Sequence, residues 1–391
     1  MMRLWKALQQ RTPLGLLQLK HDPIRLLTAI AGITFADILI FMQLGFADAL
    51  YKSNTQYPRA LQTDLVLISS EAKNFGQLSS FTRRRLYQAL DVPGVVSTDA
   101  LYLGSVTWRN PQTDKEASML LIGQNPERPA FELPVVNEQL DTVLLPDTVL
   151  FDRAARGDYS QVIEAIEQGG RITTEIGTRT ITVGGLFEVG ASFGDDGALI
   201  TSDQNFLLLS PRREPGSVSI GLIELAPDAD WDATQAALRD RLPSDVYVVT
   251  HEEYVDFELN DIQGESPIGV VFGLGSAMGF IVGVVIVYQV LSTDVNSHLG
   301  EYATFRAMGY RNSYLLGIVF EEALILSILG FVPGLIVSLG IYQLASIATA
   351  LPMVMTVGRA AGVFALTFVM CGGSGAIATR RLQAADPADI F

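Results

Sequence analysis

Four long stretches almost free of charged side chains constrain the fold of this chain more than any other feature. A helix needs about 20 apolar residues to cross hydrocarbon roughly 30 Å thick. Runs of that length occupy residues 26–49, 267–292, 314–348 and 359–379. The sequence therefore predicts an α-helical membrane protein with four transmembrane helices. The intervening residues 50–266 predict a mixed α/β extracytoplasmic domain between the first and second helices.

The charge of the chain is concentrated in that domain. The whole chain carries a formal net charge of -15, although only 18% of its residues are charged. Residues 50–266 hold 17 Lys and Arg against 33 Asp and Glu, a net -16, which leaves +1 for everything else. A surface that binds nucleic acid must be basic to neutralise phosphates. No stretch of this sequence supplies one, so nucleic acid is excluded as a partner.

Basic residues beside the apolar runs predict the orientation, because Lys and Arg are retained on the cytoplasmic side. They precede the first span, follow the second and follow the fourth, at Arg3, Lys6, Arg11, Lys20, Arg25, Arg306, Arg311, Arg380 and Arg381. Only Arg359 contradicts this pattern. We expect a multi-pass protein of the cell inner membrane whose cytoplasmic parts are an amphipathic N-terminal segment, a loop and a tail, at residues 1–25, 293–313 and 380–391. Residues 349–358 would form a short outer turn.

The outer domain shows both strand and helix patterns. Alternating and β-branched residues predict strands at 64–68, 118–122 and 217–225, and a hairpin at 171–187 in which Gly177, Gly184 and Gly185 mark turns or bulges. Helical spacing predicts helices at 78–90 and 231–242. An acidic helical pattern from Glu252 toward Pro267 predicts a stalk that joins the domain to the second span.

The sequence lacks the motifs that would indicate an enzyme. It contains neither the phosphate-binding Gly-x-x-x-x-Gly-Lys-Ser/Thr loop nor a His-Glu-x-x-His zinc pair. Its three histidines, His21, His251 and His298, fall in three different segments, and the single Cys371 has no disulfide partner. We expect no catalytic site, cofactor or metal in this chain, and we expect ATP to be hydrolysed in a separate subunit.

Carboxyl groups within or beside the spans are candidate functional residues, because an unpaired charge in lipid is costly. Asp37 lies near the middle of the first span. It is either a carboxyl that faces a neighbouring helix, protonated and hydrogen-bonded at a subunit interface, or a residue for gating or ion coupling. Glu321 and Glu322 lie at the inner end of the third span. Glu322 either reaches interfacial water or takes part in coupling to a partner.

The loop at 293–313 is short and amphipathic. Charged and apolar side chains alternate along it, at Glu301, Tyr302, Phe305, Arg306, Met308 and Arg311. A helix of this kind fits a groove on another protein. An ordinary solvated loop is the alternative interpretation.

Several strings of the sequence are similar to those of one family of membrane proteins. They lie at 41–46, 266–269, 277–283, 288–289, 301–304, 306–310, 322–326 and 385–391. In these strings and in its layout the chain resembles the DevC-type permeases of cyanobacterial exporters, which belong to the FtsX-like or MacB-like permease class of ABC transporters. The outer domain agrees with this family in layout more than in strings.

The resemblance implies a half-transporter that pairs as a homodimer, binds a separate cytoplasmic ABC ATPase and contacts a periplasmic membrane-fusion adaptor, with a TolC-like channel in the outer membrane. The loop from Glu301 to Arg311, including Gly309, together with Glu322 would relay ATP-driven movement to the periplasmic domain. The implied activity is efflux of a lipid-like or other amphiphilic substrate. The alternative is an FtsX-like transmembrane regulator that activates an envelope hydrolase and transports no cargo.

Overall fold

The computed structural model describes residues 21–72, 79–192, 194–211, 213–214, 216–260, 267–298, 300–301, 304 and 308–384. The chain divides into two compact units. The helical unit comprises residues 1–47, 270–344 and 353–391, and the sheet unit comprises residues 48–269 and 345–352.

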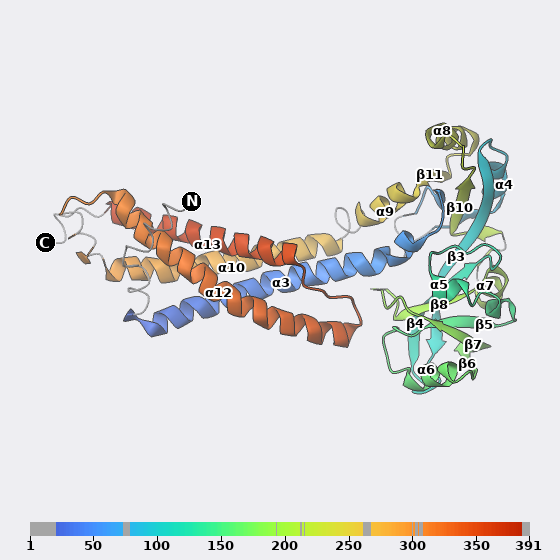
Figure 1. The fold of residues 1–391 in the computed structure, drawn as a ribbon, viewed down its shortest axis with the longest axis horizontal. Coiled ribbons are helices and arrows are strands. Elements are labelled where there is room, and N and C mark those ends of the chain that lie inside the picture. The colour runs from blue at the N-terminus through green and yellow to red at the C-terminus, as the bar shows by residue number, and fades with distance from the viewer. Residues whose placement is uncertain are drawn as a thin grey trace. The chain divides into compact units, whose positions relative to one another are not determined.

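Four helices in the described part of the chain are long and apolar enough to cross a membrane. They are α3 (Pro23–Ala60), α10 (Pro267–Ser297), α12 (Asn312–Thr349) and α13 (Val357–Ala384), labelled in Figure 1. The prediction of four such helices, with a mixed α/β domain between the first and second, is confirmed. Each helix contains one of the predicted apolar runs, and α3 and α10 continue beyond theirs, to Ala60 and Ser297.

Glycines bring the helices of the helical unit into close contact. A Cβ atom added to Gly330 of α12 would lie 2.5 Å from Cβ of Ile33 in α3. At the same level the Thr34 hydroxyl of α3 donates a hydrogen bond of 3.0 Å to the carbonyl of Gly330. A Cβ added to Gly283 of α10 would lie 2.9 Å from Cβ of Ala36. Small residues permit this approach in membrane bundles, so α3 packs closely against both α10 and α12.

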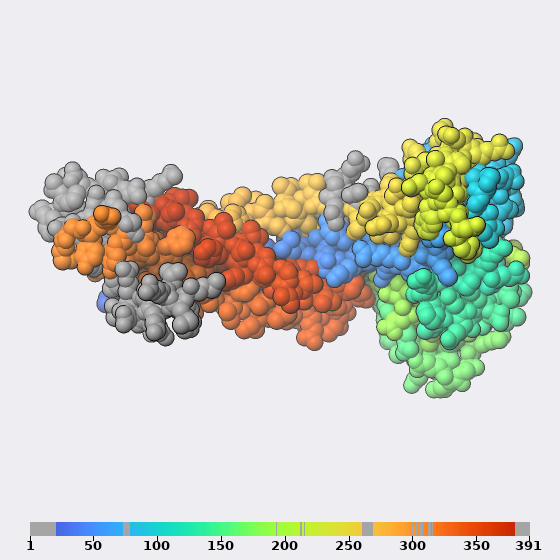
Figure 2. All heavy atoms as spheres, turned by 45° about the horizontal axis from the view of Figure 1, so that its top comes forward, coloured from blue at the N-terminus to red at the C-terminus, as the bar shows by residue number. Residues whose placement is uncertain are grey.

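Aromatic side chains fill the contact between α12 and α13. The rings of Phe331 and Phe364 have centroids 5.0 Å apart, and those of Phe320 and Phe368 are 6.0 Å apart. Figure 2 shows the two helices, orange and red, side by side within this unit. Because the pairs repeat along both helices, α12 and α13 form a continuous packed surface.

The sheet unit is built on nine strands in the order β11-β1-β10-β3-β4-β8-β5-β7-β6. Their bounds are β1 (Leu65–Ser69), β3 (Val95–Arg109), β4 (Glu116–Gln124), β5 (Thr148–Asp152), β6 (Ile172–Ile176), β7 (Arg179–Phe187), β8 (Gly197–Ser202), β10 (Ile220–Leu225) and β11 (Val246–Thr250). A two-stranded sheet joins β2 (Phe81–Thr82) to β9 (Ser217–Val218). Short helices complete the unit: α4 (Arg84–Leu90), α5 (Pro134–Asn137), α6 (Ser160–Glu167), α7 (Asp203–Leu209), α8 (Trp231–Arg241), α9 (His251–Asn260) and a 3₁₀ turn, η2 (Thr142–Leu144).

The long strand β3 belongs to two parts of this sheet at once. Its first half pairs with β10, and its second half pairs with β4. Its last residues, Trp108 and Arg109, also pair with Ile176 and Glu175 of β6. This last pairing closes β3, β4, β8, β5, β7 and β6 into a ring, from which β10, β1 and β11 continue as an open sheet. Closure removes the exposed edges of the six strands.

The predicted hairpin is confirmed as β6 and β7, which pair antiparallel. Gly177 lies in the turn with φ of +59°, a conformation that glycine adopts at no steric cost. The register between β5 and β7 shifts after Val149 and Val183, so that Gly184 is the extra residue of a bulge. Gly177 therefore marks a turn and Gly184 marks a bulge, as the sequence predicted.

Aromatic residues occupy the centre of the larger hydrophobic core of the sheet unit. Trp108 and Phe151 are fully buried, with ring centroids 5.2 Å apart, and Phe151 contacts Tyr159 edge-on at 4.9 Å. Successive residues of a strand point to opposite faces. Consequently Phe151 lies in this core whereas its neighbour Leu150 lies in a second one.

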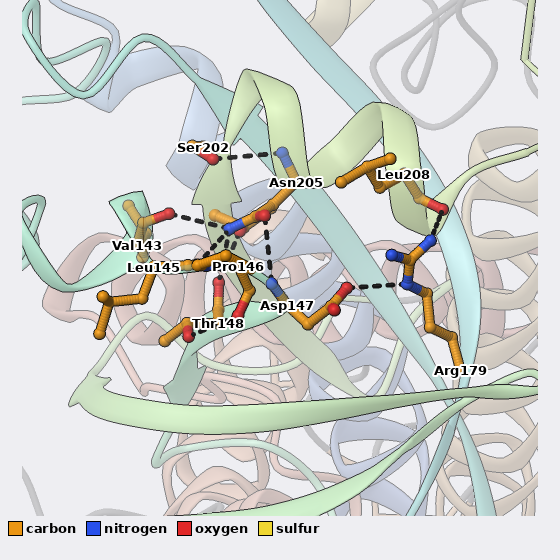
Figure 3. A network of polar contacts seen from close by, with 10 residues as sticks. Val143, Leu145, Pro146, Asp147, Thr148, Arg179, Ser202, Asn205 and Leu208 are labelled. Carbon is orange, nitrogen blue, oxygen red and sulfur yellow. Dashed lines mark hydrogen bonds and ion pairs between the residues drawn. The ribbon is translucent and has the colours of Figure 1, made fainter.

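Asn205 is a buried polar centre that fixes the segment between η2 and β5. Its side-chain NH₂ donates to the carbonyls of Val143 and Leu145, both at 2.9 Å, and to that of Thr148 at 3.4 Å. Its carbonyl oxygen accepts from the N–H of Asp147 at 3.2 Å. Figure 3 shows these contacts converging on one side chain. A single amide thus bonds to four backbone groups, of which the Thr148 carbonyl also accepts the Thr201 hydroxyl at 2.7 Å.

Two predictions for the sheet unit need correction. The helix predicted at 78–90 begins only at Arg84, because Phe81 is buried and pairs with Val218 as part of strand β2. The strand predicted at 217–225 is divided into β9 and β10 at Ser219, whose hydroxyl accepts the N–H of Leu103. In both cases a long-range pairing overrides the local pattern.

The other predicted helices appear as α8 and α9, and residues 261–266 of the predicted stalk lie outside the described residues.

Candidate functional site in the helical unit

The segment predicted to bind a partner is described in part. Residues 293–297 continue α10, and α12 begins at Asn312. Three of the predicted contact residues, Tyr302, Phe305 and Arg306, lie outside the described residues, whereas Glu301, Met308, Gly309 and Arg311 are described and exposed.

Apolar side chains are exposed just before α12. Met308 is 61% exposed and Tyr310 is 46% exposed. The ring of Tyr310 lies 4.9 Å from that of Tyr314, so part of its surface is already packed. Gly309 between them has φ of +90°, where a side chain would be strained. A flexible thioether exposed on a fixed turn can pack into an apolar groove of another protein.

Glu322 of α12 is fully buried, in a cluster of charged groups that also involves α3 and α10. It lies within hydrogen-bonding range of Asp294 of α10, and the positive charge of Arg25 is nearby. The guanidinium of Arg25 donates from Nη1 to Oδ1 of Asp294 at 3.0 Å, and its Nη2 lies 3.3 Å from Oδ2 of Asp22. Asp294 is only 4% exposed. The cluster thus connects three helices by charge and hydrogen bonding.

His298, the residue directly after α10, completes this cluster. Its Nδ1 lies 3.0 Å from the carbonyl of Asp294 and 3.6 Å from that residue's Oδ2. From the sequence, Glu322 was a candidate residue, but a site shared with Asp294, Arg25 and His298 was not predicted. The four-residue spacing of Asp294 and His298 on a helix was the available signal. Only the packing of α3, α10 and α12 reveals that all four residues meet.

Asp37 lies fully buried among three helices rather than facing a channel in the described part of the chain. The Thr367 hydroxyl of α13 donates to its Oδ1 at 2.6 Å. On another side, a Cβ added to Gly334 of α12 would lie 3.0 Å from Cβ of Asp37. Its Oδ2 has no hydrogen-bond partner. Asp37 therefore faces neighbouring helices of its own chain, and these contacts test neither a subunit interface nor a role in gating.

The sheet unit contains a polar cleft of about 610 Å³. Arg59 and His251 contribute to its wall, together with acidic residues that include Asp64, Glu132 and Glu224. The ring of His251 is hydrogen-bonded through Nε2 to the carbonyl of Pro58 at 2.7 Å, so the end of α3 and the start of α9 are joined at the cleft. Within the described residues, no group of three or more His, Cys, Asp or Glu side chains is arranged to hold a metal ion.

Asp152 is a fully buried carboxyl of the sheet unit with a structural explanation. Burial raises its pKa, and hydrogen bonds from the N–H groups of Gly190, Val189 and Ala154 oppose that rise. The bonds measure 2.8, 3.2 and 3.0 Å in that order. Asp152 therefore attaches the end of β5 to the segment after β7, and it has no free oxygen directed at a ligand site.

Part of the helical unit is similar to a known protein family. Residues 273–387 match the model of the FtsX-like permease C-terminal family. No curated protein matches the chain.

Among solved structures, the periplasmic region of MacB from Actinobacillus actinomycetemcomitans is 10% identical, covering 52% of this chain and 95% of that one with a TM-score of 0.35. The extracellular domain of the noncanonic ABC-type transporter YknZ from Gram-positive bacteria is 13% identical, covering 48% and 98% with a TM-score of 0.30. A domain of a putative permease protein from Porphyromonas gingivalis is 15% identical, covering 50% and 89% with a TM-score of 0.30.

Proposed function

We propose, from the match of residues 273–387 to the FtsX-like permease C-terminal family, that this chain is the membrane subunit of an ABC export complex. It would transmit the movement of a separate cytoplasmic ATPase to its own sheet unit and, through an adaptor, drive efflux of a lipid-like or other amphiphilic substrate. The matched residues include the whole of α12 and α13 and most of α10, together with the segment between α10 and α12. They are therefore the residues through which such movement would pass.

The proposed complex lies in the cell inner membrane, with both termini of the chain in the cytoplasm. The basic flanks of the spans support this orientation. The strings shared with DevC-type permeases support a homodimer that binds an ABC ATPase and a membrane-fusion adaptor, and that leads to a TolC-like channel. ATP hydrolysis belongs to the partner, because the chain carries no phosphate-binding loop.

The contact with the ATPase includes the exposed turn before α12. Met308 and Tyr310 offer apolar surface there, and such exposed anchors commonly account for most of the energy of a protein interface. Glu301 and Arg311 on either side would contribute polar contacts at the rim.

We expect Met308→Asp to reduce stimulation of the partner ATPase about tenfold or more, because a carboxylate replaces the apolar anchor of the contact. The measurement is ATP hydrolysis by the ATPase reconstituted with the full chain in lipid nanodiscs. Val135→Asp, which places the same charge at a 56% exposed apolar position of the sheet unit, is the matched control and should stimulate normally. Normal stimulation by Met308→Asp would show that the turn is not the contact.

A further inference from the structure

Asp294 and Glu322 are two acidic side chains, from different helices, that face each other inside the helical unit. Asp294 is 4% exposed and Glu322 is fully buried, and their carboxyl groups lie within hydrogen-bonding range of one another. The helices are tightly packed here, because Leu291 and Ala323 belong to one hydrophobic cluster. Gly375 of α13 also packs against both of these residues. Water is thereby excluded from the pair by three helices.

The pair lacks a hydrogen-bond donor unless one of its carboxyls carries a proton. An ionised carboxylate only accepts hydrogen bonds, so two carboxylates cannot bond to each other. Both oxygens of Glu322 and Oδ2 of Asp294 are buried without a donor among the described residues. The donor that reaches the pair, Nη1 of Arg25, is bound to the other oxygen of Asp294. A proton on one carboxyl would supply the missing donor between them.

The charges around the pair also favour a proton on one of its carboxyls. The charged and titratable groups around the pair are Arg25 of α3 with Asp22 just before it, His298 just after α10 and Glu321 of α12. Arg25 is shared between Asp294 and Asp22, so one guanidinium faces several carboxylates. If both members of the pair were ionised, the cluster would hold an uncompensated negative charge away from water, which is strongly unfavourable.

We propose that Asp294 and Glu322 form a proton-binding site, in which one proton shared by the two carboxyls joins α10 to α12. Arg25 balances the charge that remains on the pair. The proton comes from and returns to water, so the site needs no other ligand. This proposal does not depend on the proposed function, since it concerns the bonding between two helices whatever partner they serve.

The direct test is infrared spectroscopy of the full chain in lipid nanodiscs, which detects the C=O stretch of a protonated carboxyl. The wild-type chain at about pH 7 should show this band. In Glu322→Gln the band should lose the intensity that corresponds to one protonated carboxyl. Asp37→Asn is the control for the other buried carboxyl of the spans. The loss of band intensity caused by Glu322→Gln should be the same in the Asp37→Asn chain as in the wild-type chain.

Equal bands in the wild-type and Glu322→Gln chains would overturn the proposal. A Glu322→Gln chain that fails to fold would overturn it as well. Glutamine is neutral and its NH₂ can donate to Oδ2 of Asp294 as a protonated Glu322 does, so the variant must be tolerated if the site is protonated.

The proposal also predicts the pH dependence of stability. The native pair holds a proton that exposed carboxyls have lost at neutral pH, so the native state binds more protons than the unfolded state. Stability therefore falls as pH rises. Thermal unfolding measured from about pH 6 to about pH 9 should show a steeper decline for the wild-type chain than for Glu322→Gln, whose amide does not titrate and which lacks the shared proton. Parallel curves would contradict the proposal, because His298 is present in both chains.

Discussion

Asn205→Asp is expected to destabilise the sheet unit by about 3–5 kcal/mol, because it places an uncompensated charge in a buried site. The asparagine NH₂ donates to the carbonyls of Val143, Leu145 and Thr148, and an ionised carboxylate can donate to none of them. Because residue 205 is only 4% exposed, water cannot replace the hydrogen bonds that the NH₂ group donated. Hydrogen exchange of the full chain should show protection in β5 and β8 lowered by more than about a hundredfold.

Gln204→Glu is the matched control for this variant. It makes the same exchange of an amide for a carboxylate at the neighbouring position of α7, where the side chain is exposed. We expect a change within about 0.5 kcal/mol, as is usual for surface substitutions. If the two variants behaved alike, the hydrogen bonds drawn to Asn205 in Figure 3 would not be what stabilises this segment.

Gly330→Leu is expected to disrupt the packing of α12 against α3, at a cost of about 2–3 kcal/mol. The new Cβ would lie 2.5 Å from both Cβ and Cγ2 of Ile33, atoms too close to the backbone to move aside. The helices would have to separate, which would also break the hydrogen bond from Thr34 to the Gly330 carbonyl. The yield of folded chain after thermal challenge in nanodiscs measures this loss.

Gly340→Leu provides the comparison within the same helix. A Cβ at Gly340 meets nothing within 4 Å, so the same added side chain should be tolerated there. Similar losses for the two variants would indicate that leucine in α12 is harmful in itself, and that the close approach at Gly330 is not the cause.

The sequence predicted the helices better than the sheet because the two depend on different ranges of interaction. A charge-poor run of about 20 residues forces a spanning helix whatever surrounds it. The ring of six strands instead depends on Trp108 and Arg109 meeting Ile176 and Glu175, a pairing that no local pattern contains. Strand β8 is short and fully buried, so it shows no alternation by which to recognise it.

The candidate site was predicted only in part, for a similar reason. Glu322 was identified because a carboxyl beside a span is unusual in itself. Its neighbours Asp294 and Arg25 fall at the ends of other apolar runs, where charged residues are ordinary, so the four-residue spacing of Asp294 and His298 was the one local signal of a cluster. Asp37 was identified by its depth, whereas its partner Thr367 was not, because a threonine within an apolar run is common.

The most direct test of the proposed function is affinity isolation of the tagged full chain from native membranes in mild detergent, followed by mass spectrometry. The account predicts recovery of an ATP-binding-cassette subunit together with a membrane-fusion adaptor. An ATPase accompanied by an envelope hydrolase and no adaptor would favour the regulator that moves no cargo. Recovery of no ATP-binding-cassette subunit would contradict the central claim, that this chain works as the membrane partner of a separate ATPase.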